Sequence, residues 1–194
     1  MLDFYFIRHG QTQWNSEKKL QGRTNIQLNQ QGIEQISAYK LPAKFADFTW
    51  FCSPLLRARE SAELLGVNAA SENLLIEMNW GQWEGFTLKQ LQQKDPIGFA
   101  QAEALGIDLM PADGESPRLV GERISQWAQL LALTSPSQQL GCISHKGVIR
   151  AVYALATDWD MKGKAADKLD YHCAQHFCFD GEKWSVGELN ISLK

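Results

Sequence analysis

The sequence has little of what marks secreted, membrane or disulfide-rich proteins. Its only cysteines are Cys52, Cys142, Cys173 and Cys178, and no two of them form a CxxC pair. A disulfide framework is therefore not expected, which fits a reducing compartment. The opening "MLDFYFI" lacks a basic leader segment, and no apolar run approaches the roughly 20 residues of a membrane span. We predict a cytoplasmic protein that does not enter membranes.

The chain also lacks a strong charge of either sign. Its formal net charge is −3, with 21% charged residues. Such a balance creates no field that would recruit nucleic acid or anionic lipid, so neither is expected as a partner. The hydrophobic fraction of 44% over 194 residues suits one globular domain spanning residues 1–194, without repeats or long linkers. Any anion must be bound by a few local residues against the global charge.

Three short apolar runs have the character of buried strands: residues 4–7, 49–52 and 140–143. A helical segment follows each run, which is typical of an α/β protein with helices on both faces of a mostly parallel sheet. We predict a three-layer α/β/α sandwich. The final "HFCFDGEKWSVGEL" predicts a hairpin that turns at Asp180-Gly181 and adds antiparallel strands.

Several helix starts are marked by capping residues. Asn29 is a predicted N-cap, and Ser116 precedes Pro117 at the start of a helix with an apolar stripe. In "SPLLRARESAELL", Ser53 is the predicted N-cap and Pro54 the first helical residue. The looser segment 86–115 is predicted to be a helical excursion over one edge of the sheet, forming a small lid.

Charged and polar side chains cluster where the predicted strands end. Arg8-His9 follow the first strand, Ser53 and Arg57 the second, and Ser144-His145 the third. The carboxyl ends of parallel strands meet at one edge of an α/β sheet, where ligands bind. Two histidines at this edge favour a functional site over two separate structural histidines.

The arginines indicate which ligand this edge binds. Arg57 falls in the first turn of its helix, where the helix dipole disfavours a cation. An anion bound at the same helix terminus would resolve that conflict. Arg8 would supply a second guanidinium, and planar donors of this kind suit the oxygens of a phosphoryl group.

Four other phosphoryl or acyl chemistries lack their motifs. The chain has no GxxxxGK[ST] loop, no DxDx[TV] motif and no GxSxG elbow. Cys52 and Arg57 are separated by four residues, one short of a CxxxxxR loop. Histidine remains as the side chain able to form a covalent intermediate.

Six blocks carry a resemblance: "IRHGQTQWN", "LQGRTNIQLNQQG", "CSPLLRARESA", "LIEMNWGQWEG", "DGES" and "ISHKGVIRA". In this order they resemble the histidine phosphatase superfamily, in its phosphoglycerate-mutase-like branch. The resemblance covers residues 4 to about 156. It implies a phosphoglycerate-mutase-like fold and a phosphatase that needs no metal or other cofactor.

The same resemblance implies roles for individual residues. His9 would be the phosphorylated nucleophile and Glu77 the proton donor. Phosphoryl oxygens would be bound by Arg8, Arg57 and His145. The phosphate pocket would be completed by Asn15, Gln21 and Gly22. Arg23, Asn25 and Lys146 stand where many relatives have other residues, and Lys146 either adds a cation near the substrate or faces solvent.

Alternatives to a small-molecule phosphatase remain. A mutase of this branch usually has a basic insertion that binds a carboxylate, whereas segment 86–115 offers only Lys89 and Lys94. Phosphatase activity is therefore preferred. A non-catalytic module would be expected to lose one of His9, Arg57, Glu77 or His145, and a phosphatase acting on a protein partner stays open.

The expected substrate is a small phosphomonoester. Trp80, Trp83, Phe86 and Phe99 flank the predicted mouth of the site, which favours a flat or apolar leaving group if they line it. Small relatives that act on α-ribazole 5′-phosphate are similar in size and motif content. That compound is the specific substrate we consider.

A rival metal site can be drawn in "YHCAQHFC", from His172, Cys173, His176 and Cys178. In an extended strand, His172, His176 and Cys178 would share one face, whereas Cys173 would point to the other. We therefore predict a structural strand and no metal here.

Overall fold

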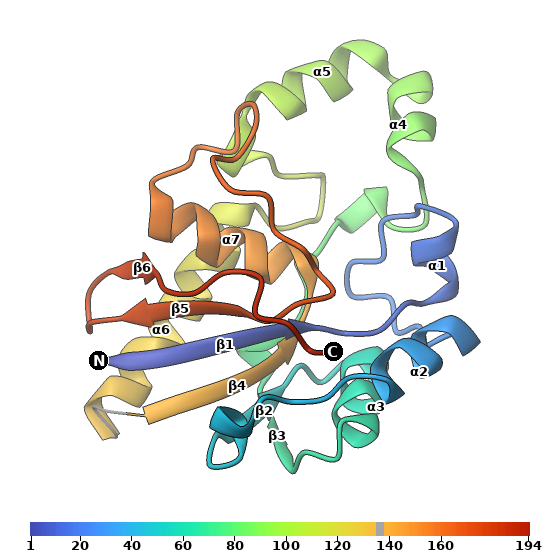
Figure 1. Ribbon diagram of the computed structural model, residues 1–194. Helices are drawn as coiled ribbons and strands as arrows, with labels where there is room; N and C mark the ends of the chain where they lie inside the picture. The colour runs from blue at the N-terminus through green and yellow to red at the C-terminus, as the bar shows by residue number, and fades with distance from the viewer. Residues whose placement is uncertain (135–137) are drawn as a thin grey trace.

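The computed structural model describes residues 1–134 and 138–194. Within them a six-stranded sheet has the strand order β3-β2-β4-β1-β5-β6 (Figure 1). The strands are β1 (Leu2–Arg8), β2 (Thr49–Cys52), β3 (Ala69–Ser71), β4 (Gln138–Ser144), β5 (Gln175–Phe179) and β6 (Trp184–Val186). All neighbours from β3 to β1 pair in parallel, whereas β5 is antiparallel to both β1 and β6. The predicted mostly parallel sheet is confirmed.

Helices cover both faces of this sheet, as predicted for a three-layer sandwich. They are α1 (Gln13–Ser16), α2 (Gln30–Ser37), α3 (Leu56–Leu64), α4 (Leu88–Lys94), α5 (Pro96–Ala104), α6 (Pro117–Thr134) and α7 (Lys146–Thr157). One core packs beneath α6 and α7, and a second packs on the opposite face beside α3. No helix in residues 1–134 or 138–194 is long and apolar enough to cross a membrane.

The central strand β1 is apolar on both sides because each side meets a different core. Phe4 and Phe6 belong to the α6/α7 core, where the Phe4 ring lies 5.6 Å from Trp127. Tyr5 and Ile7 belong to the opposite core. This two-sided burial explains why β1, β2 and β4 were recognisable as apolar runs. The strand β3 was missed because Ala69, Ala70 and Ser71 carry little apolar surface.

Helix starts were predicted with mixed success. Asn29 caps α2 by accepting a hydrogen bond from Gly32 N–H at 2.8 Å, as expected. The prediction for α3 was wrong, since this helix begins at Leu56 and Ser53 is not its cap. Asn25, from a loop remote in sequence, accepts the hydrogen bond of Leu56 N–H at 2.8 Å instead. The Ser53 hydroxyl is engaged by His145.

The segment 86–115 forms the predicted helical excursion, with α4 and α5 projecting above the sheet (Figure 1). Asp95 accepts a hydrogen bond from Gly98 N–H, and Pro96 occupies the first turn of α5. The excursion is tied to the segment that follows α7, because Ile107 N–H donates to the Asp160 carbonyl at 2.7 Å. The expected C-terminal hairpin is present as β5 and β6.

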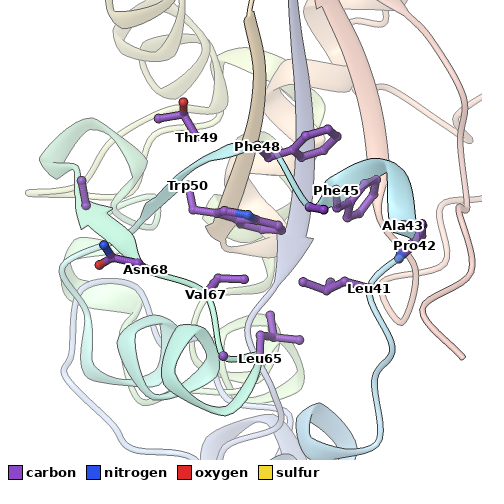
Figure 2. A pocket seen from close by; sticks show the side chains of 13 residues that line it. Leu41, Pro42, Ala43, Phe45, Phe48, Thr49, Trp50, Leu65, Val67 and Asn68 are labelled. Atoms are coloured by element: carbon purple, nitrogen blue, oxygen red, sulfur yellow. The ribbon is translucent and has the colours of Figure 1, made fainter.

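A cavity of about 710 Å³ lies beside the start of β2, away from the strand ends that carry the histidines (Figure 2). Its walls are mostly apolar, with Leu41, Phe45, Phe48 and Trp50 among the lining residues. None of the lining residues is titratable. General acid–base or nucleophilic chemistry therefore has no candidate group in this cavity.

Candidate active site

The parallel pairing of β1 and β4 brings the two strand-end histidines together. Arg8 is in register with Ser144, so the residues that follow, His9 and His145, leave the sheet side by side. Their ring centroids are 5.0 Å apart, and both side chains are buried. The convergence predicted from the ends of the strands is thus present.

Hydrogen bonds fix the tautomer of His9. Its Nδ1 lies 2.7 Å from the Gly10 carbonyl oxygen, which can only accept, so Nδ1 carries the proton. The lone pair is then on Nε2, which accepts a hydrogen bond from Arg57 Nε at 3.3 Å. Gly10 is itself fixed because its N–H donates to Ser61 Oγ at 3.1 Å. The nitrogen of His9 that keeps a lone pair is therefore Nε2.

The surroundings of His9 keep its imidazole neutral. Burial lowers the pKa of His9 well below the usual 6.5, and the charges of Arg8 and Arg57 lower it further. The hydrogen bond to Gly10 opposes this shift without reversing it. A neutral imidazole retains the lone pair that a nucleophile needs.

Arg57 is a fully buried cation held in place by backbone carbonyls. Its Nη1 donates to the Thr24 carbonyl at 2.9 Å and its Nη2 to the Gly22 carbonyl at 2.8 Å. Burial lowers its pKa to about 10, so it remains charged at neutral pH. In the described residues neither Arg57 nor Arg8 forms an ion pair, and the buried Nε of Arg8 has no hydrogen-bond partner. Two such guanidinium groups fit an anion between them.

His145 is oriented by a hydroxyl. Its Nε2 lies 2.7 Å from Ser53 Oγ, which also accepts a hydrogen bond from Leu55 N–H at 3.3 Å. A Ser53 hydroxyl that donates to Nε2 places the ring proton on Nδ1. This Nδ1 is buried and has no partner in the described part of the chain. It is a donor suited to a phosphoryl oxygen. Burial, followed by the charge of Arg57, lowers the pKa of His145 well below 6.5.

Glu77 is buried, contrary to the usual exposure of a loop carboxylate. Its Oε1 accepts from Met78 N–H at 2.8 Å and its Oε2 from Gly147 N–H at 3.3 Å. Burial raises the pKa of Glu77, although the Met78 hydrogen bond and the Arg57 charge partly oppose it. A carboxyl with a raised pKa beside a phosphate site suits proton donation.

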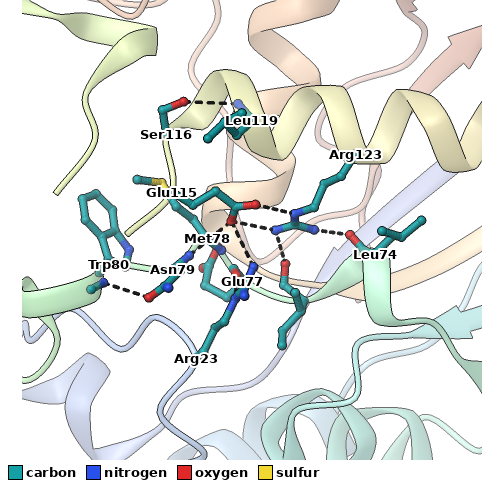
Figure 3. A network of polar contacts seen from close by, with 12 residues as sticks. Arg23, Leu74, Glu77, Met78, Asn79, Trp80, Glu115, Ser116, Leu119 and Arg123 are labelled. Carbon is teal, nitrogen blue, oxygen red and sulfur yellow. Dashed lines mark hydrogen bonds and ion pairs between the residues drawn. The ribbon is translucent and has the colours of Figure 1, made fainter. Parts of the chain in front are cut away.

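A polar network clamps the backbone around Glu77 (Figure 3). Arg123 of α6 donates to the carbonyls of Leu74 and Ile76 and is paired with Glu115 at 2.9 Å. Glu115 in turn accepts from Asn79 N–H at 3.3 Å. These contacts hold the chain on both sides of Glu77. The sequence placed Glu115 in the "DGES" block, but nothing local marked its pairing with Arg123.

The remaining predicted residues shape the loop beside Arg57. Gln21 accepts a hydrogen bond from Thr12 Oγ1 at 2.8 Å, and Asn15 accepts one from Thr12 N–H at 3.1 Å. Gly22 has a φ of +51°, and a Cβ there would lie 1.7 Å from Glu84 Oε1. The loop therefore requires glycine at this position. Direct phosphate contacts by Asn15, Gln21 and Gly22 stay a prediction.

Glu84 is the second carboxylate near this loop, and its oxygens are already engaged. They accept from Arg23 N–H at 2.8 Å, from Thr24 N–H at 3.0 Å and from Thr24 Oγ1 at 2.5 Å. Such a carboxylate is suited to holding the loop in shape.

The metal site considered for residues 171–178 combined side chains that do not lie together. The strand β5 begins at Gln175, so His172 lies outside it. The Nδ1 of His172 lies 3.3 Å from Gln35 Nε2, within hydrogen-bond distance. On the face of His176 and Cys178, Asp3 of β1 is the third member of the group. His176 Nδ1 accepts from Glu188 N–H at 3.2 Å, which puts the ring proton on Nε2, 2.8 Å from Asp3 Oδ1. The Nδ1 lone pair of His176 is used by Glu188 N–H, and the protonated Nε2 that faces Asp3 has no lone pair for a metal.

A pocket of about 220 Å³ has Met78, the residue after Glu77, and Gly147 in its wall. Stacked aromatic rings form part of its wall, with Trp83 lying 6.1 Å from Trp80 and 5.7 Å from Phe99 between centroids. Of the four aromatics predicted at the mouth, Phe86 is not among the lining residues.

The chain is similar to known phosphatases. The metal-independent phosphoserine phosphatase of Arabidopsis thaliana is 25% identical over 172 residues, which cover 84% of this chain and 72% of that protein. The Entamoeba histolytica phosphoserine phosphatase in complex with 3-phosphoglyceric acid superimposes with a TM-score of 0.83 at 22% identity, covering 99% of this chain and 98% of that one. An Escherichia coli K-12 protein assigned as an α-ribazole-5′-P phosphatase gives 0.75 at 22% identity, covering 100% and 99%.

The two structural superpositions, both at 22% identity, support the α/β fold. The family itself follows from the sequence model that matches nearly the whole chain, residues 4–192. The convergence of His9, Arg57 and His145 at one sheet edge agrees with that match. The chain belongs to branch 1 of the histidine phosphatase superfamily.

Proposed function

We propose that this histidine phosphatase hydrolyses a small-molecule phosphomonoester through a phosphohistidine on His9, without a metal. The observation that carries the proposal is the lone pair of His9 Nε2, fixed by the Nδ1 hydrogen bond to Gly10. Arg8 and Arg57 supply the positive charge that a metal supplies elsewhere. Such fixed cations stabilise the oxygens of a transferring phosphoryl group.

In the first step, His9 Nε2 attacks phosphorus in line with the leaving oxygen. The N–P bond forms as the P–O bond to the leaving group breaks, and Glu77 gives its proton to the departing alkoxide. The phosphorylated ring carries a positive charge, which is stabilised by the hydrogen bond that its Nδ1–H donates to the Gly10 carbonyl. Arg8, Arg57 and the Nδ1–H of His145 bind the phosphoryl oxygens.

In the second step, water replaces the leaving group. Glu77, now a carboxylate, accepts a proton from water as the water oxygen attacks phosphorus. The P–N bond breaks, and inorganic phosphate leaves with His9 neutral again. Glu77 has regained the proton it gave, so the cycle is closed.

Mutase activity is the alternative function, because a mutase would use the same first step and then return the phosphoryl group to an organic acceptor. The lid segment carries only Lys89 and Lys94 as basic residues, which disfavours the carboxylate-binding insertion of mutases. Phosphatases among the similar proteins support transfer to water.

One observation is compatible with α-ribazole 5′-phosphate as the specific substrate. The stacked Trp80, Trp83 and Phe99 line a pocket beside Glu77, and flat rings stack well on such walls. A phosphorylated protein side chain is the other alternative, and the small volume of this pocket favours a small molecule.

The test is to trap the intermediate. After rapid quenching, protein incubated with ³²P-labelled phosphomonoester should hold label that is lost in acid and kept in alkali. His9→Ala should hold none, whereas His172→Ala, an exposed histidine, should label normally. The same protein should keep its activity after exhaustive chelation. Acid-stable label, label on His9→Ala, or activity that zinc alone restores would overturn the proposal.

A further inference from the structure

Two cations, Lys146 and Arg8, flank the Tyr171 ring, and a third, Arg150, lies over the Trp159 ring. Lys146 Nζ lies 5.2 Å from the centroid of Tyr171, and Arg8 Cζ lies 6.0 Å from the same centroid. Arg150 follows one turn after Lys146 on α7, and its Cζ lies 5.3 Å from the Trp159 ring. None of the three forms an ion pair with a carboxylate in residues 1–134 or 138–194.

The space beside these cations is a cleft that shares a lining residue, Arg150, with the 220 Å³ aromatic pocket. A cavity of about 500 Å³ is lined by Lys146, Arg150 and Tyr171, and by Lys164 and Lys168. The last two come from the segment after α7, which rises beside α7 toward α5 before returning to β5 (Figure 1). Arg150 also lines the 220 Å³ pocket with the aromatic rings. Arg150 therefore lines both cavities.

This concentration of positive charge is more than one phosphoryl group requires. Arg8 and Arg57 already serve the phosphate beside His9, while the chain as a whole is negative. Asp167, which also lines the 500 Å³ cavity, accepts from Tyr153 Oη at 2.9 Å, and Glu77 accepts from two backbone N–H groups, whereas Glu103 of the 220 Å³ pocket is exposed. Burial, then the charges of Arg150 and Arg8, lower the pKa of Lys146. An anion in the cleft would relieve that repulsion.

We propose that Lys146 and Arg150 bind a second acidic group, which lies on the leaving group of the substrate. The inference rests on the proposed function, because it places the phosphoryl group on His9. Tyr171 would form one wall of this subsite, packed between Lys146 and Arg8. The acidic group is a carboxylate or a second phosphate, since both present oxygens to a guanidinium and an ammonium. Lys146, whose residue type departs from many relatives, thereby determines specificity.

The subsite distinguishes between substrate classes. Mutases of the family are expected to bind the carboxylate through an inserted basic segment, whereas here the cations come from α7. The neutral nucleoside of α-ribazole 5′-phosphate would leave Lys146 and Arg150 unused. A phosphorylated carboxylic acid or a bisphosphate would occupy both cavities.

The test compares substrates that differ by the acidic group alone. O-phosphoserine is matched with O-phosphoethanolamine for the carboxylate, and propane-1,3-diyl bisphosphate with 3-hydroxypropyl phosphate for the second phosphate. We expect kcat/KM to be higher for the acidic member of at least one pair by roughly 10- to 100-fold, the usual worth of a charged hydrogen bond. The pair that responds identifies the acid.

Variants assign the preference to residues. Lys146→Gln and Arg150→Gln should each remove most of the preference by raising KM for the substrate with the second acidic group. The kcat/KM of the substrate that lacks this group should stay within about threefold. Arg150→Lys should restore part of it. Lys44→Gln, an exposed lysine paired with Glu188, is the matched control and should change neither substrate.

Two results would overturn the inference. One is equal kcat/KM for both members of both pairs, and the other is an equal loss on both members in the variants. Thermal unfolding of each variant separates a folding defect from a binding defect. If the wild-type protein forms phosphohistidine yet shows no preference, only the second subsite fails. If no phosphohistidine forms, the proposed function fails first.

Discussion

Arg57 Nε donates a hydrogen bond to His9 Nε2 at 3.3 Å, while the other nitrogens of the same guanidinium bind the carbonyls of Gly22 and Thr24. One buried side chain therefore connects His9 at the end of β1, the helix α3 and the loop that follows α1. The cation that would stabilise the phosphoryl group also sets the position of the atom that attacks it.

Replacing Arg57 with lysine should therefore lower activity strongly, although the positive charge is kept. A single ammonium cannot reach His9 and both carbonyls at once. We expect kcat/KM for any phosphomonoester to fall by roughly 10²- to 10³-fold, the usual loss when one transition-state donor is removed. Arg59→Lys, at an exposed position in the same helix, is the control. Activity within a few-fold of wild type in Arg57→Lys would remove Arg57 from phosphoryl binding.

Arg123 should act on the reaction through Glu77. Arg123→Ala removes the donors to the Leu74 and Ile76 carbonyls and frees Glu115. Because Glu77 would be displaced, hydrolysis of an alkyl phosphate should fall by roughly 10²-fold, as small misplacements of catalytic groups can cost. An aryl phosphate, which needs less protonation, should lose much less, and Arg123→Lys should recover part of the activity. Equal losses on both substrates would make Arg123 a residue of general stability. Arg118→Ala, on the exposed side of α6, is the control.

The sequence predicted those parts of the site that follow from one strand and its next few residues. His9, Arg57 and His145 could be placed together because parallel strands end at a common edge. The contacts that orient them could not, because each partner is remote in sequence. Asn25 caps α3 from another loop, and Arg123 reaches Glu77 from α6. Likewise Asp3 joins His176 across β1 and β5, where a single strand had suggested His172.

The two site histidines should make folding stability depend on pH. Folding lowers the pKa of His9 and of His145 below 6.5, so the unfolded chain binds more protons below that pH. The free energy of unfolding should therefore decrease as the pH falls from about 6.5. Glu77 acts in the opposite direction, because its pKa is raised from 4.5 on folding and its buried charge is neutralised as the pH falls.

Urea unfolding at about pH 7.5 and about pH 5.5 measures the balance. The His9→Asn/His145→Asn double variant should lose less stability than the wild-type protein between the two pH values. His172→Asn, in an exposed turn, should follow the wild-type protein. A double variant with the full wild-type pH dependence would show that neither histidine is held neutral by the fold.

Glu77→Gln tests whether this buried carboxyl is the proton donor or only part of the loop. Glutamine keeps an oxygen able to accept from Met78 N–H or Gly147 N–H, so the loop should stay in place. For an alkyl phosphate the rate should fall by roughly 10²- to 10⁴-fold, the usual worth of general acid catalysis. For 4-nitrophenyl phosphate, whose phenolate leaves unaided, phosphorylation of His9 should suffer much less.

Hydrolysis of the phosphohistidine should then become limiting in Glu77→Gln, because no base activates water. The aryl phosphate should give a burst of one nitrophenolate per active site followed by a slow steady state. In the wild-type protein, alkyl phosphate turnover should fall as the pH rises through the raised pKa of Glu77, since only the protonated acid can donate. That basic limb should be absent from the burst rate with the aryl substrate. Equal losses on both substrates without a burst would assign Glu77 to the structure of the loop, and proton donation would have to come from elsewhere.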